Sequence, residues 1–298
     1  MKIFSGSSNP SLAQEIAAGL GTSLSEIELS RFPNGEARVW VKTDVQRENV
    51  VLIQSFSEPV DFHIIEFSLI VDALRRAGAR KIISVIPWFG YGLQDKAFRF
   101  GEPIAAKVIA DFVSREVRRH ILVNLHSDSI VGFFPVPATQ TSALSLFVEY
   151  LQKQDLKNAV VVSPDFGAIK RNRVFANFLE VPQYYINKER DRVTGEITVH
   201  ELSHSVSGKH CLLLDDLIST GGTVVEVTHM LKKTGAAKIS FFATHALLVG
   251  DAVENLKKAS IDELVVTNTV LIPKEKKLPN MNVLSIAQKL IPEIKIWI

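Results

Sequence analysis

One short stretch, residues 211–227 (CLLLDDLISTGGTVVEV), constrains the fold of this chain more than any other. Its apolar start predicts a buried strand, because a strand covered on both faces need not alternate apolar and polar residues. Two acids, a small-residue loop and apolar residues at helical spacing follow. A strand, a glycine loop and a helix start form a typical anion site, since backbone N–H groups and the helix dipole attract negative charge.

Two adjacent carboxylates ahead of the loop narrow the kind of ligand. Acceptors followed by backbone donors suit a phosphorylated sugar with vicinal hydroxyls, such as ribose 5-phosphate, and no Gly-Lys-Ser/Thr of a nucleotide P-loop follows. The alternative is a polar turn with an acidic helix cap, but two acids at the mouth of a buried strand are costly without a ligand or cation. We therefore predict a ribose 5-phosphate site formed by Asp215, Asp216, Ser219, Thr220, Gly221, Gly222 and Thr223.

The bulk composition bounds the class of protein. A chain of 298 residues is long enough for two domains, each with its own core. Its 34 basic and 32 acidic residues nearly cancel, so we expect no nucleic-acid partner. The single cysteine, Cys211, can form no internal disulfide and predicts a reducing, cytoplasmic location. No apolar run resembles a signal peptide or reaches membrane-spanning length, so we expect no membrane partner.

Strand-like and helix-like segments alternate from Asn49 onward, which predicts an α/β fold with mainly parallel sheets flanked by helices. The predicted strands are residues 50–53, 81–86, 120–125, 158–162, 211–214 and 265–267. Two prolines and a polar cluster at residues 135–141 mark the predicted domain boundary. The domains would then be residues 1–140 and 141–298.

The two halves resemble each other. Residues 74–82 (LRRAGARKI) match residues 231–239 (LKKTGAAKI), and each segment joins an amphipathic helix to a strand. This predicts two similar domains. Where the second half carries Asp215 and Asp216, the first carries Gln54 and Ser55. The first half has therefore kept the scaffold and lost the acidic sugar site.

Two further polar residues, His126 and Asp165, stand behind predicted strands. Ligands of open parallel sheets bind outside the carboxyl ends of the strands, so both residues could join the sugar site at a position between the domains. His126 could be a metal ligand, a base or a cap, and a lone histidine is more often structural. Near a polyphosphate, an imidazole and a carboxylate are suitable Mg²⁺ ligands, because Mg²⁺ combines few protein groups with phosphate oxygens and water.

Two charged segments are candidates for loops at the site. Residues 187–196 (NKERDRVTGE) predict either a solvated surface or a mobile lid whose cations neutralise charge on a transferring group. Residues 92–103 also mix cations with acceptors, and residues 31–36 (RFPNGE) predict a loop between two strand-like segments.

Taken together, these segments resemble the ribose-phosphate diphosphokinase family, also called phosphoribosyl diphosphate synthases, over nearly the whole chain. The resemblance rests on residues 6–9 (GSSN), 31–36 (RFPNGE), 94–96 (QDK), 101–104 (GEPI), 125–128 (LHSD), 162–165 (VSPD), 188–190 (KER), 215–216 (DD) and 220–223 (TGGT). It implies two phosphoribosyltransferase-like domains, the second binding ribose 5-phosphate, and a homo-oligomer, either a dimer or a hexamer.

The resemblance also implies a reaction and its residues. The 1-hydroxyl of ribose 5-phosphate would take the diphosphoryl group of MgATP, which gives 5-phosphoribosyl 1-diphosphate and AMP. Mg²⁺ would be held by His126 and Asp165, and the transferring group would be stabilised by Lys188 and Arg190. ATP would be bound by Gln94, Asp95 and Lys96 and, across a subunit interface, by Phe32, Asn34 and Glu36.

The chain departs from the family pattern at two positions. Leu93 stands where the family usually has an arginine that helps to hold ATP, and Ser219 stands where the phosphate loop often begins with aspartate. Two other functions share parts of the pattern. A phosphoribosyltransferase that consumes the product would share residues 211–223, and a non-catalytic regulatory homologue would share the fold.

Overall fold

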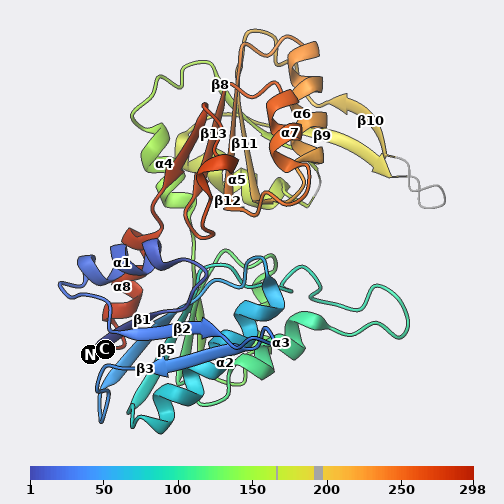
Figure 1. Ribbon diagram of the computed structural model, residues 1–298. Coiled ribbons are helices and arrows are strands. Elements are labelled where there is room, and N and C mark those ends of the chain that lie inside the picture. Colours follow the sequence, from blue (N-terminus) through green and yellow to red (C-terminus); the bar gives the residue numbers. More distant parts are fainter. Residues whose placement is uncertain (166, 191–196) are drawn as a thin grey trace. The chain divides into compact units, whose positions relative to one another are not determined.

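The computed structural model describes residues 1–165, 167–190 and 197–298, and for residues 187–190 and 197–201 it describes the backbone alone (Figure 1). Two compact units make up the chain. The first comprises Met1–Ala143, Asn268–Leu271 and Ser285–Ile298, and the second comprises Leu144–Thr267 and Ile272–Leu284. Each unit is a mainly parallel sheet with helices packed on it, which confirms the predicted α/β fold.

The first unit has a five-stranded parallel sheet in the order β1-β4-β5-β6-β7. Its strands are β1 (Lys2–Ser5), β4 (Asn49–Ile53), β5 (Lys81–Ile86), β6 (Arg119–Val123) and β7 (Ala138–Thr141). Its helices are α1 (Pro10–Gly19), α2 (Val60–Arg76), α3 (Ala105–Val113), the 3₁₀ helix η1 (Asp128–Phe133) and α8 (Ala287–Lys295). The apolar strand runs are buried because α2 and α3 share a core with one face of the sheet.

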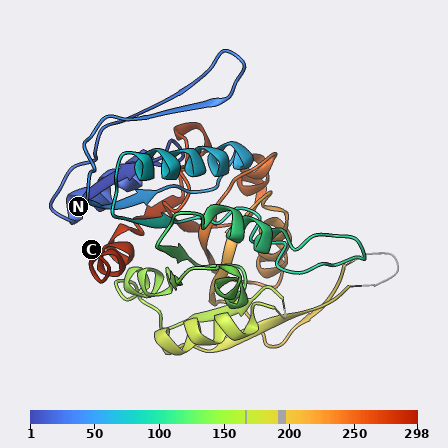
Figure 2. The ribbon, with the colours of Figure 1, turned by 90° about the horizontal axis from the view of Figure 1, so that it is seen from below.

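An antiparallel hairpin of β2 (Ile27–Arg31) and β3 (Ala37–Val41) accompanies this sheet. The hairpin lies along α2 (Figure 2), where the Arg31 guanidinium stacks 3.5 Å from the ring centroid of Phe62. The turn between the strands contains Gly35 at φ +91°, in the left-handed region that glycine adopts readily. The loop predicted at residues 31–36 is thus the tip of the hairpin.

The second unit has a seven-stranded sheet in the order β10-β9-β8-β11-β12-β13-β14, parallel except for the antiparallel pair β9–β10. Its strands are β8 (Ala159–Ser163), β9 (Gln183–Arg190), β10 (Ile197–Leu202), β11 (His210–Ile218), β12 (Lys238–Ala246), β13 (Glu263–Thr267) and β14 (Met281–Leu284). Its helices are α4 (Leu144–Leu151), α5 (Ile169–Leu179), α6 (Gly222–Lys233), α7 (Ala252–Lys258) and the 3₁₀ helix η2 (Lys274–Lys276).

Helices cover both faces of this second sheet. On one face the ring of Phe242 in β12 contacts Phe147 of α4 and Phe175 of α5, with ring centroids 5.5 Å and 5.7 Å away. On the other face, residues of α6 and α7 share a core with Leu213 and Phe241. The continuous apolar run at the start of β11 is therefore buried from both sides, as the sequence predicted.

The predicted domain boundary needs a correction at the C-terminus, because Asn268–Leu271 and Ser285–Ile298 belong to the first unit. Leu290 and Ile294 of α8 are buried, and α8 packs against α1. Asn9 donates from its side chain to the carbonyl oxygen of Asn268 at 2.8 Å, and Ser285 bonds to Glu15. These contacts join distant parts of the chain, so no local pattern could predict them.

The repeat noticed in the sequence has a structural counterpart. Gly78 and Gly235 follow the ends of α2 and α6 at φ +89° and +92°, and β5 and β12 begin a few residues later. A residue with a side chain is strained at such φ values, which explains why both copies of the segment carry glycine there.

Candidate active site

The acidic pair lies inside a strand rather than after one. β11 extends to Ile218 because its pairing with β12 continues to Ala246, whereas its pairing with β8 covers only His210–Leu212. The predicted strand end at residue 214 was therefore too early. Asp215 and Asp216 occupy the portion of β11 that no longer pairs with β8, so groups from other elements can contact them there.

The loop after β11 has the geometry of an anion site. Gly221 at φ +77° is the N-cap of α6 and offers no side chain to cap the helix, so the first amides of α6 have no side-chain partner there. Asn255 donates to the carbonyl oxygen of Thr220 at 2.8 Å, and this bond fixes the loop from the α7 side. Thr220, Gly222 and Thr223 are exposed. Exposed amides at the positive end of a helix dipole can bind phosphate.

Arg171 in the first turn of α5 contacts both aspartates. Its Nη2 lies 3.6 Å from Oδ1 of Asp215, and its Nη1 forms a closer ion pair with Oδ1 of Asp216. The same Oδ1 of Asp215 accepts a hydrogen bond from the backbone N–H of Asp216 at 2.7 Å. The guanidinium therefore holds two neighbouring carboxylates in one arrangement.

The ion pair between Arg171 and Asp216 is largely shielded from water. The side chain of Asp216 is 8% exposed and that of Arg171 is 31% exposed. Burial lowers the pKa of Arg171 from its ordinary value, while the carboxylates of Asp215 and Asp165 act in the opposite direction. Removing Arg171 would leave the nearly buried carboxylate of Asp216 without this partner, which is unfavourable.

Sequence reasoning missed Arg171. It lies within the charged segment 170–173 (KRNR), which looks like an exposed helix surface. One signal was available: α5 has no acidic residue in its first turn and carries cations there instead. Cations are unfavourable at the positive end of a helix dipole, so a partly buried arginine at that place indicates a nearby anion.

The two predicted magnesium ligands follow different strands, and each is held by its own turn. Asp165, exposed after β8, accepts at Oδ1 from the N–H of Ala168 at 2.8 Å, which supports the start of α5. His126 is exposed after β6, where Gln140 fixes the turn by accepting from the N–H of Leu125 at 3.0 Å. The two residues belong to different units.

The donor set at these positions suits magnesium only with help from a substrate. Within the described ranges, no group of three or more His, Cys, Asp or Glu side chains could hold a metal ion. The exposed carboxylate of Asp165 is a hard oxygen ligand of the kind that Mg²⁺ prefers. A magnesium ion here would take most of its ligands from phosphate oxygens and water, which is its usual coordination.

The predicted ATP residues cluster in two loops of the first unit. Phe32, Asn34 and Glu36 share the β2–β3 turn, where Oδ1 of Asn34 accepts from the N–H of Glu36 at 3.2 Å and Phe32 is exposed. Gln94, Asp95 and Lys96 lie in the loop before α3, and Lys96 is exposed with Nζ 5.2 Å from the ring centroid of Phe98.

The predicted lid begins as a strand. Lys188 and Arg190 belong to the backbone of β9, where they pair with Val199 and Ile197 of β10. The charged sequence has no period-two pattern, so it indicated a loop, but backbone pairing in a hairpin does not require that pattern. The remaining lid residues, 191–196, lie outside the described residues.

Comparisons with known proteins match this architecture over its full length. A family model described as the N-terminal domain of ribose phosphate pyrophosphokinase matches residues 1–116, and one described as a phosphoribosyl synthetase-associated domain matches residues 198–294. Ribose-phosphate pyrophosphokinase of Buchnera aphidicola subsp. Schizaphis graminum is 41% identical, covering 99% of this chain and 95% of that protein. The chain belongs to the ribose-phosphate pyrophosphokinase family.

Other relatives agree. Ribose-phosphate pyrophosphokinase of Bacillus subtilis is 38% identical, with 96% of this chain and 90% of that protein covered. The crystal structure of phosphoribosylpyrophosphate synthetase from Mycobacterium smegmatis superposes with a TM-score of 0.92 at 33% identity, covering 99% of this chain and 97% of that one. The family resemblance drawn from the motifs is confirmed, and a match across both units disfavours a single-domain phosphoribosyltransferase.

In this ribose-phosphate pyrophosphokinase homologue, the first unit has Gln54 at the place of the acidic pair, and the side chain of Gln54 is hydrogen-bonded within the protein. Gln54 accepts at Oε1 from the hydroxyl of Ser8 at 2.8 Å and donates from Nε2 to Oε1 of Glu66 at 2.8 Å. Ser7 donates to the same Glu66 oxygen from both its N–H and its hydroxyl, each at 2.8 Å. A Cβ on Gly6 would lie 2.1 Å from Gln54 Oε1, so the network fills this space.

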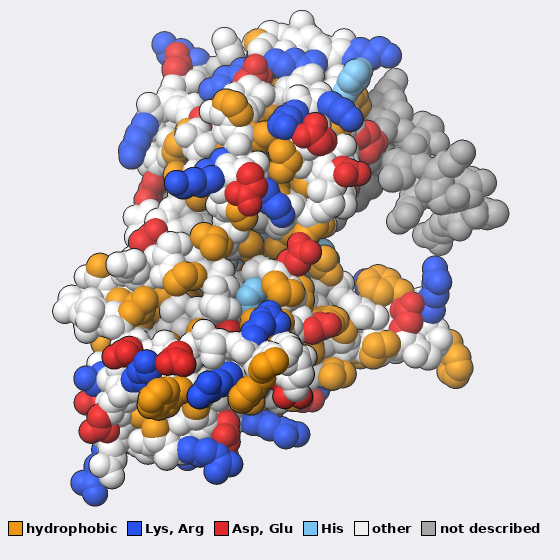
Figure 3. Space-filling view, in the orientation of Figure 1, with side chains coloured by type: hydrophobic (Ala, Val, Ile, Leu, Met, Phe, Trp, Pro, Cys, Tyr) orange, Lys and Arg blue, Asp and Glu red, His pale blue; other side chains and the backbone are white. Residues whose placement is uncertain are grey.

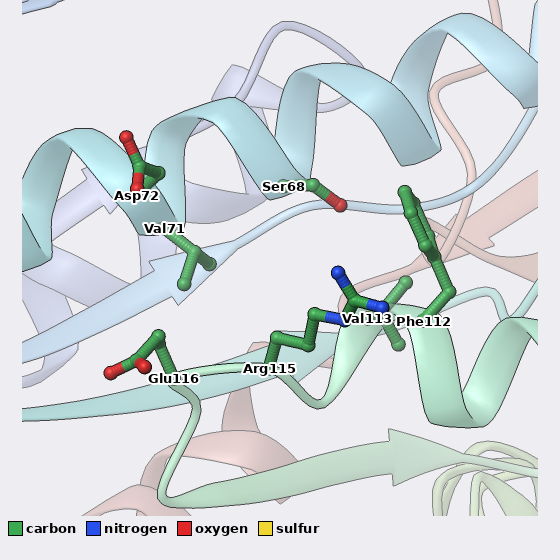
Figure 4. A pocket seen from close by; sticks show the side chains of 7 residues that line it. All are labelled: Ser68, Val71, Asp72, Phe112, Val113, Arg115 and Glu116. Carbon is green, nitrogen blue, oxygen red and sulfur yellow. The ribbon is translucent and has the colours of Figure 1, made fainter.

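A cavity of about 380 Å³ lies elsewhere in the first unit, between α2, α3 and the turn that follows α3 (Figure 4). It is lined by Ser68, Val71, Asp72, Phe112, Val113, Arg115 and Glu116. Its acids already have partners, because Asp72 pairs with Arg76 and Glu116 with Arg75. It has no glycine loop at a helix start, so it does not offer the phosphate cradle of the β11–α6 site.

Charged side chains of both signs are mixed on the surface. On the face seen in Figure 3, acidic and basic side chains are interspersed rather than gathered in fields of one sign. In the described part of the chain, no helix combines the length and the apolar character that crossing a membrane requires.

Proposed function

We propose that this protein transfers the diphosphoryl group of ATP to ribose 5-phosphate. The anomeric hydroxyl oxygen attacks the β-phosphorus, the bond from that phosphorus to the α,β-bridging oxygen breaks, and AMP leaves while the hydroxyl proton passes to solvent. The observation that supports this most is the β11–α6 site, where paired acids precede an uncapped helix start in a member of this family.

Each part of the sugar has a complementary group in this proposal. Asp215 and Asp216 accept hydrogen bonds from vicinal ribose hydroxyls. The N–H groups of the loop that contains Ser219, Thr220, Gly221, Gly222 and Thr223 donate to the 5-phosphate. Charge-assisted bonds of this kind contribute about 1.5–3 kcal/mol each, which gives useful affinity from few contacts.

The donor side uses residues of the first unit. Gln94, Asp95 and Lys96 bind ATP, and Phe32, Asn34 and Glu36 of a neighbouring subunit contact the adenine. Mg²⁺, held by Asp165 and His126, would neutralise phosphate charge and orient the diphosphoryl group when bound.

Lys188 and Arg190 are the proposed catalytic residues. Diphosphoryl transfer requires in-line positioning and charge neutralisation more than a protein nucleophile. Two cations that meet the transferring group only as charge develops would lower the barrier, by analogy with about 3–4 kcal/mol for one oxyanion donor. Lys188→Ala should therefore abolish turnover while leaving ribose 5-phosphate binding nearly intact, and equal loss of both would contradict this role.

A homo-oligomer, either a dimer or a hexamer, and a cytoplasmic location complete the proposal. The α2–α3 surface supports self-association, because Ile65, Leu69, Val108 and Phe112 are exposed there on two packed helices. Exposed apolar patches of this kind commonly mark protein interfaces. Phe112→Glu should lower the mass measured by light scattering; an unchanged mass would remove this surface from the interface.

The test of the function mixes the protein with ATP, Mg²⁺ and ribose 5-phosphate and measures AMP. AMP that forms only when the sugar is present supports diphosphoryl transfer. AMP formed equally without the sugar would indicate a nucleotide hydrolase. Sugar binding without any AMP would indicate the non-catalytic regulatory homologue.

A further inference from the structure

Arg171 occupies a place that the stability of its own helix does not explain. It lies in the first turn of α5, where the helix dipole opposes a positive charge. Its partners, Asp215 and Asp216, come from β11, on a different element of the unit. The arginine therefore serves the acidic strand rather than the helix that carries it.

The guanidinium also keeps a hydrogen-bond donor unused. Its Nε is buried and has no hydrogen-bond partner within the part of the chain that the structure describes. Arginine offers five N–H donors in a planar fork, and buried donors are normally paired. The fork is thus oriented toward the carboxylates at the expense of its own complete hydrogen bonding.

We propose that Arg171 is a positioning and specificity-determining residue for ribose 5-phosphate. Its guanidinium holds Asp215 and Asp216 in an arrangement in which their carboxylates can accept hydrogen bonds from the vicinal hydroxyls of the sugar. The same charge offsets the repulsion between two carboxylates and an incoming phosphate. This role rests on the proposed function, because it assumes that the acidic pair binds the sugar.

The geometry explains why an arginine is used. Asp216 is nearly buried, so its position is set by its partners rather than by water. One guanidinium spans both carboxylates, 3.6 Å from Asp215 Oδ1 and closer to Asp216. A lysine would supply the charge without the planar fork, so it should orient only one carboxylate well.

The experiment compares Arg171→Gln, Arg171→Lys and the wild type. Arg173→Gln is the matched control, since Arg173 is an exposed arginine on the same helix. Binding of ribose 5-phosphate and of 2-deoxyribose 5-phosphate is measured by calorimetry with Mg²⁺ and a non-hydrolysable ATP analogue. Steady-state kinetics then separate KM for the sugar from kcat, and thermal unfolding reports whether each variant is folded.

Arg171→Gln should raise the dissociation constant and KM for ribose 5-phosphate about 10- to 100-fold and leave kcat within a few-fold. Its preference for ribose over the 2-deoxy sugar should fall toward one. Arg171→Lys should lie between this variant and the wild type, and it decides the question if Arg171→Gln does not fold. Arg173→Gln should match the wild type.

Three results would overturn the role of Arg171. They are unchanged sugar affinity in a folded Arg171→Gln, a loss of kcat with KM unchanged, and an Arg171→Lys variant that equals the wild type in affinity and sugar preference. Failure of the proposed function would show in the wild-type protein itself, which would then either not bind ribose 5-phosphate or bind it without forming AMP.

Discussion

The side-chain amide of Asn172 donates a hydrogen bond to the main-chain carbonyl oxygen of Leu214, with 3.1 Å between nitrogen and oxygen. The same amide donates to the carbonyl oxygen of Ala168 at 3.0 Å, and Asn172 is fully buried. Leu214 directly precedes Asp215. The bond therefore fixes α5, which carries Arg171, to the acidic strand that Arg171 contacts.

Asn172→Ala should destabilise the protein by about 2–3 kcal/mol, because it leaves the Leu214 carbonyl without this donor and opens a small void. Ribose 5-phosphate affinity should fall as well, since α5 and β11 lose their link. Urea unfolding and calorimetry measure the two effects. Asn177→Ala, an exposed position on the same helix, should change stability by less than about 0.5 kcal/mol. A stable Asn172→Ala with wild-type affinity would show that the link is dispensable.

Leu93→Arg should tighten ATP binding. Leu93 is exposed in the loop before α3 and cannot donate a hydrogen bond, whereas an arginine there could bond to phosphate. A charge-assisted bond of about 1.5–3 kcal/mol corresponds to roughly a 10- to 100-fold lower KM for ATP. KM for ribose 5-phosphate should not change. If KM for ATP stays the same, position 93 does not contact the nucleotide.

Acid should weaken the first unit through His120. The hydroxyl of Ser114 donates to the carbonyl oxygen of Ala110, so it accepts from Nε2–H of His120, and Nδ1 accepts from the hydroxyl of Ser84. Burial lowers the pKa of this neutral ring to about 3. Between that pH and about 6.5 the unfolded chain binds the extra proton.

Folding stability should therefore be complete above pH 6.5 and fall as the pH drops toward 3, by about 1.4 kcal/mol per unit from this one residue. His210, whose pKa burial lowers to about 4, acts with the same sign. Urea unfolding at pH 7 and pH 4.5 should show a clearly smaller pH effect in His120→Gln than in the wild type. An identical pH effect would assign the acid sensitivity to other groups.

Tyr150→Phe should lower the stability of the protein without changing its binding of ribose 5-phosphate. The Tyr150 hydroxyl donates to Glu263 and accepts from Asn282 at 3.0 Å, and burial with the Glu263 bond raises the pKa of Tyr150 to about 12. This network lies at the start of β13, away from the acidic end of β11. Losing it should cost about 1–3 kcal/mol of unfolding free energy and leave ribose 5-phosphate affinity unchanged. Exposed Tyr185→Phe is the control. Reduced sugar affinity in Tyr150→Phe would connect the two ends of the sheet.

The strands, the helices and the glycine loop of the site could be predicted from the sequence, because they depend on patterns of neighbouring residues. Continuous apolar runs predicted the buried strands, and the left-handed glycines of the loop and the repeat marked turns that other residues resist. The end of β11 was misjudged because pairing with β12, not side-chain pattern, carries the strand past Asp216.

Arg171 and α8 were missed for a different reason. Arg171 meets the aspartates only through tertiary packing of α5 on β11, and α8 joins the first unit only through its packing on α1. Contacts between residues far apart in the chain leave no periodic trace in one sequence.

The central claim is that the β-phosphorus of ATP moves intact, with the γ-phosphoryl group, onto the anomeric oxygen of ribose 5-phosphate. The most direct measurement follows the reaction of the purified protein with both substrates and Mg²⁺ by phosphorus NMR. The account predicts equal amounts of AMP and a sugar that carries a diphosphate at C1. ADP with a sugar bisphosphate, or AMP with free diphosphate and unchanged ribose 5-phosphate, would contradict it.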